Sequence, residues 1–326
     1  MPDMPKVVYF GSDAICLPGL TFLHEAASGC SVAAIVSQPD RRQGRGKQLQ
    51  ANPVAAYART HGIPLFQPER PDAQLAQWIL GEGIRVAVVM AYGHFLAKAL
   101  REAPDHGMVN LHGSILPRYR GASPVESAVA NGETETGVCL MQVAREMDAG
   151  VVADCERVLI GPADTSADVR AKIGRAVVPL MDRNLDGLLS GTLQFSPQDG
   201  SLATYCRKIH KEDAALDFSR PARMLYDQLR AFTPWPGGYF DHEQTRIKVG
   251  RASFEANEDQ VSAPGTVVTA DNVLKVATGE GTIIFHTLQR PGGRMLPVRD
   301  FLSGYSIRPG DMLIGGKFEP LIRKVP

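Results

Sequence analysis

The chain has 326 residues, of which 44% are hydrophobic and 21% are charged, a globular composition that argues against disorder or a fibrous structure. This length predicts about two domains. The 35 basic and 35 acidic side chains give a formal net charge of zero, with −3 over residues 1–206 and +3 over residues 207–326. This balance argues against wholesale non-specific nucleic-acid binding and allows a local basic patch.

The longest apolar run, Val86 to Tyr92, is too short to span a membrane, and the first residues lack the apolar core of a signal peptide. Five cysteines, an odd number without a CxxC pair, are scattered along the chain as Cys16, Cys30, Cys139, Cys155 and Cys206. We therefore expect a cytoplasmic protein with no membrane partner, disulfide framework or zinc knuckle, in which cysteines are apolar filler. His106 and His112 have no neighbouring ligands at metal spacing, so we expect no metal site.

The first half of the chain alternates short β-branched runs with helical stretches. Strands are predicted over residues 6–10, 31–38, 63–68, 85–92, 108–113 and 138–143. Their apolar runs are continuous, as in strands buried on both faces. This pattern predicts an α/β fold with a Rossmann-like, doubly wound and mostly parallel sheet. Ligands in such folds bind beyond the carboxyl ends of the strands.

The second half predicts a different architecture. A long amphipathic helix is expected over residues 165–189, with Thr165 and Asp168 as its capping signal. A helix over residues 222–231 is followed by short strands at turn-like spacing, which predicts a C-terminal OB-like β-barrel. The boundaries that we predict are an N-terminal domain over 1–190, a linker over 191–208 and a C-terminal domain over 209–326.

Three familiar motifs are incomplete. Gly11 to Asp13 does not continue into GxGxxG, the segment around Lys47 lacks a P-loop's leading glycine, and HGSIL around Ser114 lacks the first glycine of a nucleophile elbow.

One group of residues remains as a candidate catalytic site. Asn110 and His112 end the fifth predicted strand on one face, and Asp148 follows the sixth. An amide and an imidazole can stabilise an oxyanion, and a carboxylate can orient the imidazole. From spacing alone, a structural histidine is the favoured interpretation; the nearby Asn110, the position at the sheet end and the constrained loop make the two interpretations about equal.

Two further features have competing interpretations. A basic loop contains Arg41, Arg42, Arg45 and Lys47, and it fits either a solvated surface loop or contacts with RNA. Trp235, flanked by prolines, could stack on a base, but we expect a buried anchor between the domains.

Together, these residues resemble the folate-dependent formyltransferases, which use 10-formyltetrahydrofolate. The segment VNLHGSILPRYRG at 109–121 with Asp148 carries the family motif, and VVMAYG at 88–93 is similar to its folate-pocket strand. SQPDRRQGRGKQL at 37–49 and RAFTPWPGGYF at 230–240 resemble the family members that formylate the methionine of initiator methionyl-tRNA. The likeness runs along nearly the whole chain.

The resemblance implies roles for individual residues. Asn110, His112 and Asp148 correspond to the catalytic trio. The folate contacts fall on the tetrapeptide that usually reads SLLP and on the pocket strand, which here are Ser114, Ile115, Leu116, Pro117, Val89, Tyr92 and Gly93. Ile115 is a conservative departure. The first turn, GSDAICLP in place of GTPxFA, and MDAG in place of LDTG depart further.

The resemblance also implies the reaction and its partners. A monomer would transfer the formyl group of 10-formyltetrahydrofolate, without a metal, to the α-amine of methionine on the initiator tRNA. The basic loop would read the acceptor stem. Three alternatives remain: a formyltransferase for a small amine, a hydrolase that releases formate from the same folate, and a non-catalytic RNA-binding protein.

Overall fold

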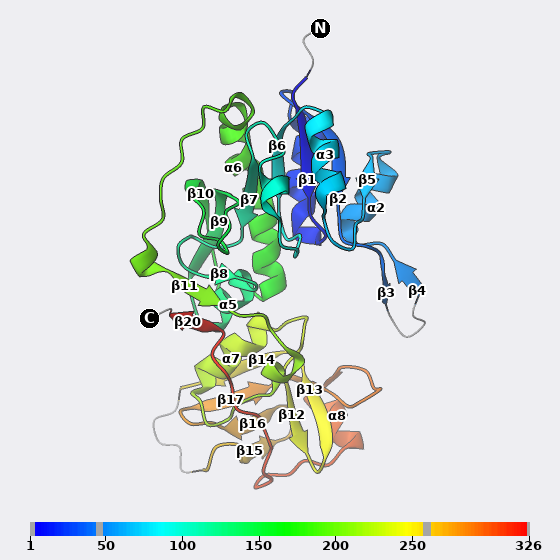
Figure 1. Cartoon of the computed structure of the whole chain (residues 1–326). Coiled ribbons are helices and arrows are strands. Elements are labelled where there is room, and N and C mark those ends of the chain that lie inside the picture. Colours follow the sequence, from blue (N-terminus) through cyan, green and yellow to red (C-terminus); the bar gives the residue numbers. More distant parts are fainter. Residues whose placement is uncertain (1–3, 44–47, 257–261, 325–326) are drawn as a thin grey trace.

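The computed structural model of the chain describes residues 4–43, 48–256 and 262–324. The strands of its largest sheet are β1 (Lys6–Phe10), β2 (Ser31–Val36), β5 (Leu65–Phe66), β6 (Ile84–Val89), β7 (Met108–His112), β9 (Glu135–Gln142) and β10 (Val152–Leu159). They form a seven-stranded sheet in the order β10-β9-β7-β6-β1-β2-β5 (Figure 1). Within this sheet, β1, β2, β5, β6 and β7 pair in parallel, which confirms the predicted Rossmann-like sheet.

Helices cover both faces of this sheet. They are η1 (Ala14–Cys16), α1 (Leu17–Thr21), the π-helical turn η2 (Phe22–Ala26), α2 (Pro53–Thr60), α3 (Ala73–Gly81), α4 (Lys98–Arg101), α5 (Pro124–Ala130) and α6 (Ser166–Ser190). Val7 and Tyr9 of β1 pack in one apolar cluster with α1, α2 and α6, whereas Val8 and Phe10 pack in another with α3 and α4. The continuous apolar run therefore reflects burial on both faces. Thr165 and Asp168 form the predicted capping box of α6.

The direction of β9 differs from the expectation for the sheet. We expected the loop that carries Asp148 to meet His112 because both follow neighbouring parallel strands. Instead, β9 runs antiparallel to β7, and Gln142 at the end of β9 pairs with Val109. The β9–β10 loop therefore starts beside the amino end of β7 and reaches His112 by folding back.

The C-terminal part is built from antiparallel strands, as predicted. Its elements are η4 (Lys211–Ala214), α7 (Ala222–Ala231), β12 (Tyr239–His242), β13 (Thr245–Val249), β14 (Ala252–Glu255), β15 (Val267–Ala270), β16 (Leu274–Ala277), β17 (Thr282–Phe285), β18 (Thr287–Gln289), β19 (Leu296–Pro297) and α8 (Val298–Gly304). The strands form two four-stranded sheets, β12-β13-β18-β19 and β14-β17-β16-β15. Over the described ranges, no strand of one sheet pairs with a strand of the other, so the pairings do not close a barrel.

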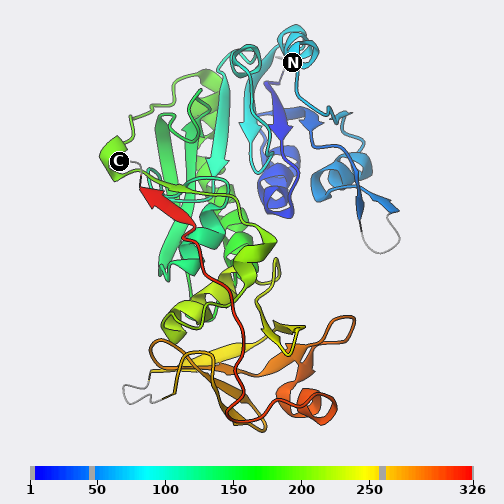
Figure 2. The same ribbon diagram turned by 60° about the horizontal axis from the view of Figure 1, so that its bottom comes forward.

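The chain returns to the N-terminal part at its end. After α6, the chain forms η3 (Gly200–Leu202) and β11 (Thr204–Cys206), which pairs in parallel with β8 (Arg120–Gly121). The last strand, β20 (Ile322–Lys324), runs back from the C-terminal part and pairs with β11 (Figure 2). This three-stranded sheet lies next to the loop that follows β7, so segments far apart in sequence meet there.

Polar contacts also join the two parts. Arg230, which is 5% exposed, forms a buried ion pair with Asp227 and donates to the Asp164 carbonyl oxygen at 2.7 Å. The predicted buried anchor, Trp235, is 53% exposed, so that expectation was wrong. Phe232 occupies the buried position instead, and the Gly237 amide closes the turn on its carbonyl.

The expectation that all five cysteines are apolar filler was also wrong. Cys16, Cys30 and Cys206 are free and buried, but Cys139 and Cys155 form a disulfide. These two residues are direct cross-strand neighbours in the antiparallel pair of β9 and β10. Because register rather than sequence spacing brings the two thiols together, spacing alone could not predict the bond.

Candidate active site

Asn110 and His112 lie at the carboxyl end of β7, two residues apart and on the same face of the strand. Val89, the last residue of β6, is the direct neighbour of Asn110 in the parallel pairing. The Asn110 side chain is half-buried and makes no hydrogen bond to another residue that the structure describes. Both N–H groups of its amide are therefore free to donate to a ligand.

The His112 imidazole is 5% exposed and has a protein acceptor at each ring nitrogen. Its Nε2 atom lies 2.9 Å from the carbonyl oxygen of Tyr119. Because a carbonyl oxygen only accepts, Nε2 carries a proton. Its Nδ1 atom lies 3.6 Å from Oδ2 of Asp148. In this conformation, the Nε2–H group donates to the Tyr119 carbonyl oxygen, and the Nδ1 atom lies beside the Asp148 carboxylate at a distance longer than a hydrogen bond.

Asp148 lies in the β9–β10 loop with a left-handed backbone, φ +50°. Its carboxyl group is 16% exposed, and Oδ2 accepts a hydrogen bond of 2.8 Å from the Gly121 amide. Gly121 must be glycine, because its φ is +113° and a Cβ atom would lie 2.2 Å from the Cys206 carbonyl oxygen. The carboxylate is thus held between the β8 backbone and the imidazole.

The tetrapeptide Ser114 to Pro117 forms the loop between β7 and β8. The buried Ser114 hydroxyl donates to the Arg118 carbonyl oxygen at 2.7 Å, so it closes the loop. A Cβ atom on Gly137 of β9 would lie 2.4 Å from the Ile115 side chain. The peptide bond between Leu116 and Pro117 is cis. This loop therefore packs across β9 beside the trio.

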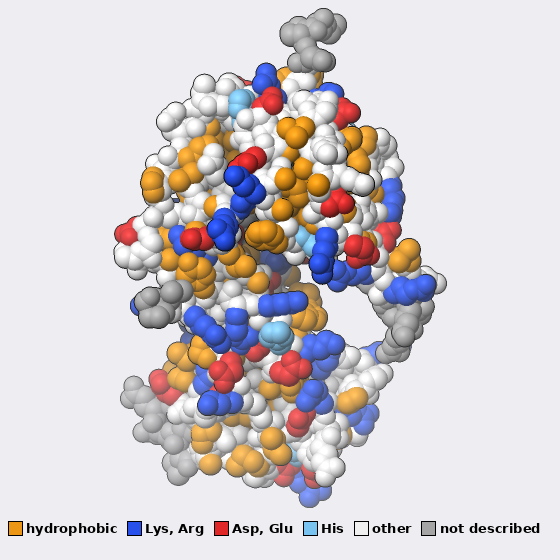
Figure 3. Space-filling model, viewed as in Figure 1, with side chains coloured by type: hydrophobic (Ala, Val, Ile, Leu, Met, Phe, Trp, Pro, Cys, Tyr) orange, Lys and Arg blue, Asp and Glu red, His pale blue; other side chains and the backbone are white. Residues whose placement is uncertain are grey.

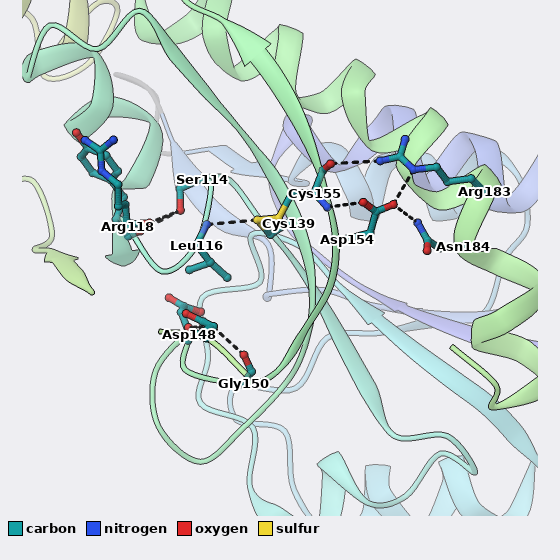
Figure 4. The surroundings of a disulfide bond; sticks show 12 residues. Ser114, Leu116, Arg118, Cys139, Asp148, Gly150, Asp154, Cys155, Arg183 and Asn184 are labelled. Atoms are coloured by element: carbon teal, nitrogen blue, oxygen red, sulfur yellow. Dashed lines mark hydrogen bonds and ion pairs between the residues drawn. A yellow bond between two sulfur atoms is a disulfide. The ribbon is translucent and has the colours of Figure 1, made fainter. Parts of the chain in front are cut away.

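The disulfide lies directly under this loop. The Leu116 amide donates to the sulfur of Cys139 at 3.3 Å (Figure 4). Cys139 is the neighbour of His112 in the pairing of β9 with β7. On the other side of the bond, Asp154 accepts hydrogen bonds from Arg183 and Asn184. The bond thus connects the strand beside the trio to the outer strand β10.

The predicted folate-pocket strand presents unpartnered polar atoms. Val89 and Tyr92 are buried, and Gly93 adopts φ +78°. Burial raises the pKa of Tyr92 to about 12, so its hydroxyl is a neutral donor near neutral pH. Among the residues that the structure describes, Tyr92 Oη and His94 Nε2 are buried without a hydrogen-bond partner. Buried polar groups are normally paired, so a polar ligand fits this segment.

Basic side chains gather on both sides of the narrow waist between the two parts of the molecule (Figure 3). Arg41 and Arg42 lie on β3 (Arg41–Gln43), which pairs with β4 (Gln48–Gln50) in a projecting hairpin. Both arginines are exposed, and Arg41 donates to Gln38. The predicted contacts Arg45 and Lys47 lie outside the described residues.

The C-terminal part adds a basic hollow of about 300 Å³. Arg246, Lys248 and Arg290 line it, next to Gln289 and Pro291. Three of the basic side chains of residues 207–326 thus line one hollow, although Arg246 also pairs with Asp241.

Sequence reasoning missed the backbone groups that hold the trio, namely the Tyr119 carbonyl and the Gly121 amide. It also missed Gln198, whose amide reaches the backbone of Asp148. Gly121, in the segment RYRG, was a usable signal that another part of the backbone packs closely at this position. No sequence pattern marks Gln198, because its role depends on where the linker passes.

Two family models match the chain. The first, described as formyl transferase, matches residues 6–182, and the second, described as the C-terminal domain of formyl transferase, matches residues 208–306. The chain is 40% identical over 311 residues to a protein named methionyl-tRNA formyltransferase from Sorangium cellulosum. The alignment covers 94% of this chain and 99% of the relative. A protein of the same name from Parvibaculum lavamentivorans is 38% identical with the same coverage.

Solved structures share the fold at lower identity. An N-formyltransferase from Helicobacter canadensis, in complex with folinic acid and dTDP-3-aminofucose, has a TM-score of 0.66 and 17% identity, and covers 88% of this chain and 100% of that one. HypX from Aquifex aeolicus in complex with tetrahydrofolic acid has a TM-score of 0.62 and 13% identity, and covers 94% of this chain and 49% of that one.

Proposed function

The chain belongs to the formyl transferase family, and we propose that it is a methionyl-tRNA formyltransferase. It transfers the formyl group of 10-formyltetrahydrofolate to the α-amine of methionine on initiator methionyl-tRNA. Relatives that carry this name match nearly the whole chain at 38–40% identity, including its C-terminal part. That full-length match favours a tRNA acceptor over a small amine.

The observation that carries the proposal is the arrangement at the end of β7. A free Asn110 amide lies on the same strand face as a buried His112 that is backed by a carboxylate. Formyl transfer to an amine passes through a tetrahedral species whose oxygen carries negative charge. Such an oxygen needs a hydrogen-bond donor, and a proton must leave the attacking nitrogen.

Each member of the trio then has a distinct role. Asn110 donates to the oxyanion, because its amide has no protein partner. The His112 imidazole, whose Nε2–H group donates to the Tyr119 carbonyl oxygen and whose Nδ1 atom faces Asp148, forms part of the site beside Asn110 on the same strand face. Asp148 orients the imidazole and assists proton movement from the attacking amine to the folate nitrogen.

The folate-binding part of the proposal rests on the loop and the pocket strand. Ser114, Ile115, Leu116 and Pro117 form one wall, and Val89, Tyr92 and Gly93 form another. The unpartnered atoms of Tyr92 and His94 are suited to the polar edge of a pterin ring. 10-Formyltetrahydrofolate is a substrate that donates its formyl group. None of the residue roles above requires a metal ion.

The tRNA partner is assigned to the basic surfaces. Arg41, Arg42, Arg45 and Lys47 of the hairpin contact the acceptor stem, and the C-terminal basic hollow contacts the backbone phosphates. The division into residues 1–190, 191–208 and 209–326 assigns catalysis and the acceptor-stem contacts to the first part, and the contacts with the backbone phosphates to the last. We place this monomeric enzyme in the cytoplasm, where translation is initiated. Among the described residues, no helix has the length and apolar character needed to cross a membrane.

An acceptor comparison tests this function. Purified protein and 10-formyltetrahydrofolate are mixed with methionylated initiator tRNA, methionylated elongator tRNA, a small amine such as an aminosugar nucleotide, or no acceptor. Initial rates of formyl transfer should be highest with the initiator tRNA by orders of magnitude. Preference for the small amine would establish the first alternative. Formate release without an acceptor would establish the hydrolase, and binding of tRNA without any turnover would establish the RNA-binding protein.

A further inference from the structure

Residues 196–206, named the linker clamp here, lie against both groups that flank His112. We propose that this segment positions the His112–Asp148 pair, with Gln198 and Thr204 as positioning residues for formyl transfer. The inference rests on the proposed function. It assigns part of the catalytic geometry to a segment that lies outside the seven-stranded sheet.

Gln198 holds the backbone of the loop that carries the carboxylate. Its Nε2 atom donates to the Asp148 carbonyl oxygen at 2.9 Å and to the Gly150 carbonyl oxygen at 2.7 Å. Two residues earlier, Ser196 exchanges two backbone hydrogen bonds with Val152, at 2.8 and 2.9 Å. The linker clamp therefore contacts the β9–β10 loop along the stretch that follows Asp148.

Arg120 fixes the direction of the Gln198 amide. Its Nε and Nη2 atoms donate to Gln198 Oε1 at 3.0 and 2.7 Å, and its Nη1 atom donates to the Tyr205 hydroxyl at 3.0 Å. A guanidinium only donates and a carbonyl only accepts, so the amide can adopt only this orientation. Arg120 is 6% exposed, and within the described ranges it forms no ion pair. A buried cation whose acceptors are an amide and a hydroxyl belongs to a polar network rather than to a surface salt bridge.

Thr204 holds the other partner of the imidazole. Its hydroxyl accepts a hydrogen bond of 2.8 Å from the Tyr119 amide, and its own amide donates to the Pro117 carbonyl oxygen at 3.3 Å. The Tyr119 carbonyl is the group that accepts from His112 Nε2. Both acceptors of the imidazole, Tyr119 and Asp148, are thus anchored by side chains of the linker clamp.

These two anchored residues share an unusual backbone. Tyr119 has φ +59° and Asp148 has φ +50°, a region that non-glycine residues seldom occupy. Such positions persist only when the surrounding structure holds them. Gln198 and Thr204 hold them together with the Gly121 amide, which donates to Asp148, and with Glu133, which accepts from the Tyr119 hydroxyl. Removing Gln198 or Thr204 should therefore shift a partner of His112 rather than a substrate contact. Misplacement of a catalytic group by about 1 Å can slow a reaction about 100-fold.

The test uses the full chain and two pairs of variants. Gln198→Ala removes the whole amide, whereas Gln198→Glu keeps an acceptor for Arg120 and loses the donors to the Asp148 loop. Thr204→Val removes the hydroxyl, and Thr204→Ser retains it. Gln194→Ala is the matched control, because that exposed glutamine, two residues before the linker clamp, donates to its neighbour Thr192 and to no other described residue. Thermal melting selects variants that fold like the wild type.

We expect Gln198→Ala, Gln198→Glu and Thr204→Val to lower kcat about 10- to 100-fold, with the KM values for tRNA and folate unchanged. Thr204→Ser and Gln194→Ala should keep the wild-type kcat. The ring carbon signals of His112 in NMR spectra should change in Gln198→Ala and not in Gln194→Ala, with no substrate present. Wild-type kcat in both Gln198→Glu and Thr204→Val, or unchanged His112 signals in Gln198→Ala, would overturn the proposal. If the wild type itself transferred no formyl group, the proposed function would fail instead, while the NMR comparison would still test the positioning.

Discussion

Asp148 and His112 are held together by a carboxylate–imidazole contact, with Oδ2 of Asp148 3.6 Å from Nδ1 of His112. The same Oδ2 atom accepts from the Gly121 amide at 2.8 Å. One oxygen therefore connects the β9–β10 loop, the β8 backbone and the imidazole. Changes at this oxygen should affect the chemistry more than substrate binding.

Asp148→Asn keeps the size of the side chain and removes its charge. We expect kcat for formyl transfer to fall about 10²- to 10⁴-fold, because proton movement and imidazole orientation both depend on the carboxylate. The dissociation constant for the folate should stay within about twofold, as measured by titration calorimetry. Asp182→Asn, a change at an exposed position of α6, is the control. Activity equal to that of the control would remove Asp148 from the mechanism.

Asn110→Ala tests the oxyanion donor. Loss of one such donor lowers kcat about 10²- to 10³-fold, and the folate should still bind because the amide is not one of its proposed contacts. Steady-state kinetics and calorimetry on the same preparation separate the two effects. Asn272→Ala, at an exposed turn between β15 and β16, should behave like the wild type. A weaker folate complex with an unchanged kcat would instead make Asn110 a binding residue.

Arg45→Ala tests tRNA recognition by the hairpin loop. A contact of an arginine with a phosphate or a base is worth about 1–3 kcal/mol, so KM for initiator methionyl-tRNA should rise about 5- to 100-fold. The dependence of KM on salt should weaken, and folate affinity should not change. Arg85→Ala serves as the control. Arg85 is an exposed arginine at the amino end of β6, where it pairs with Asp105. Equal KM values for both variants would exclude a role for Arg45.

Thiol counting tests the disulfide. Burial raises the pKa of Cys16 to about 12 and the pKa values of Cys30 and Cys206 to about 11, so these thiols should react slowly with iodoacetamide in the folded protein at pH 8. In guanidinium chloride without a reductant, three cysteines should be alkylated, and with dithiothreitol all five. Five alkylated cysteines without the reductant would contradict the Cys139–Cys155 bond.

Acid should loosen the attachment of the C-terminal part at Asp213. Burial favours the neutral carboxyl, but hydrogen bonds from Arg207 and from the His210 amide outweigh it and lower the pKa of Asp213 below its usual value. Stability from this carboxylate is therefore present above the unfolded pKa of about 3.9 and lost as pH falls through the lower folded pKa. Urea unfolding at pH 7 should show a loss of about 1.5–3 kcal/mol for Asp213→Asn. The difference between the variant and the wild type should shrink at pH 3, and a constant difference would contradict the assignment.

Much of the fold could be predicted because local signals determine it. The continuous apolar runs of β1 and β6 predict burial on both faces, and Thr165 with Asp168 predicts the start of α6. The helix over Ala222–Ala231 ends where its periodicity ends. The same pattern of apolar runs predicts a strand that ends at Asn110 and His112, and that strand is β7 in the structure.

The remaining features depend on long-range pairing, which spacing does not encode. The antiparallel direction of β9 determines how the Asp148 loop approaches His112, and it also pairs Cys139 with Cys155. Trp235 was expected to be buried because its flanking prolines fix the chain path, but those prolines do not determine which neighbouring ring fills the interior. Gln198 is meaningful only once the linker has been placed beside the active site.

The most direct test follows the formyl group itself. The enzyme in excess is mixed with 10-formyltetrahydrofolate labelled with ¹³C in the formyl group and with initiator methionyl-tRNA, and the quenched products are analysed by mass spectrometry. We predict that the label appears on the α-amine of methionine in a single turnover, and that Asn110→Ala slows its appearance. Label recovered as formate, or on an amine other than that of methionine, would contradict the account.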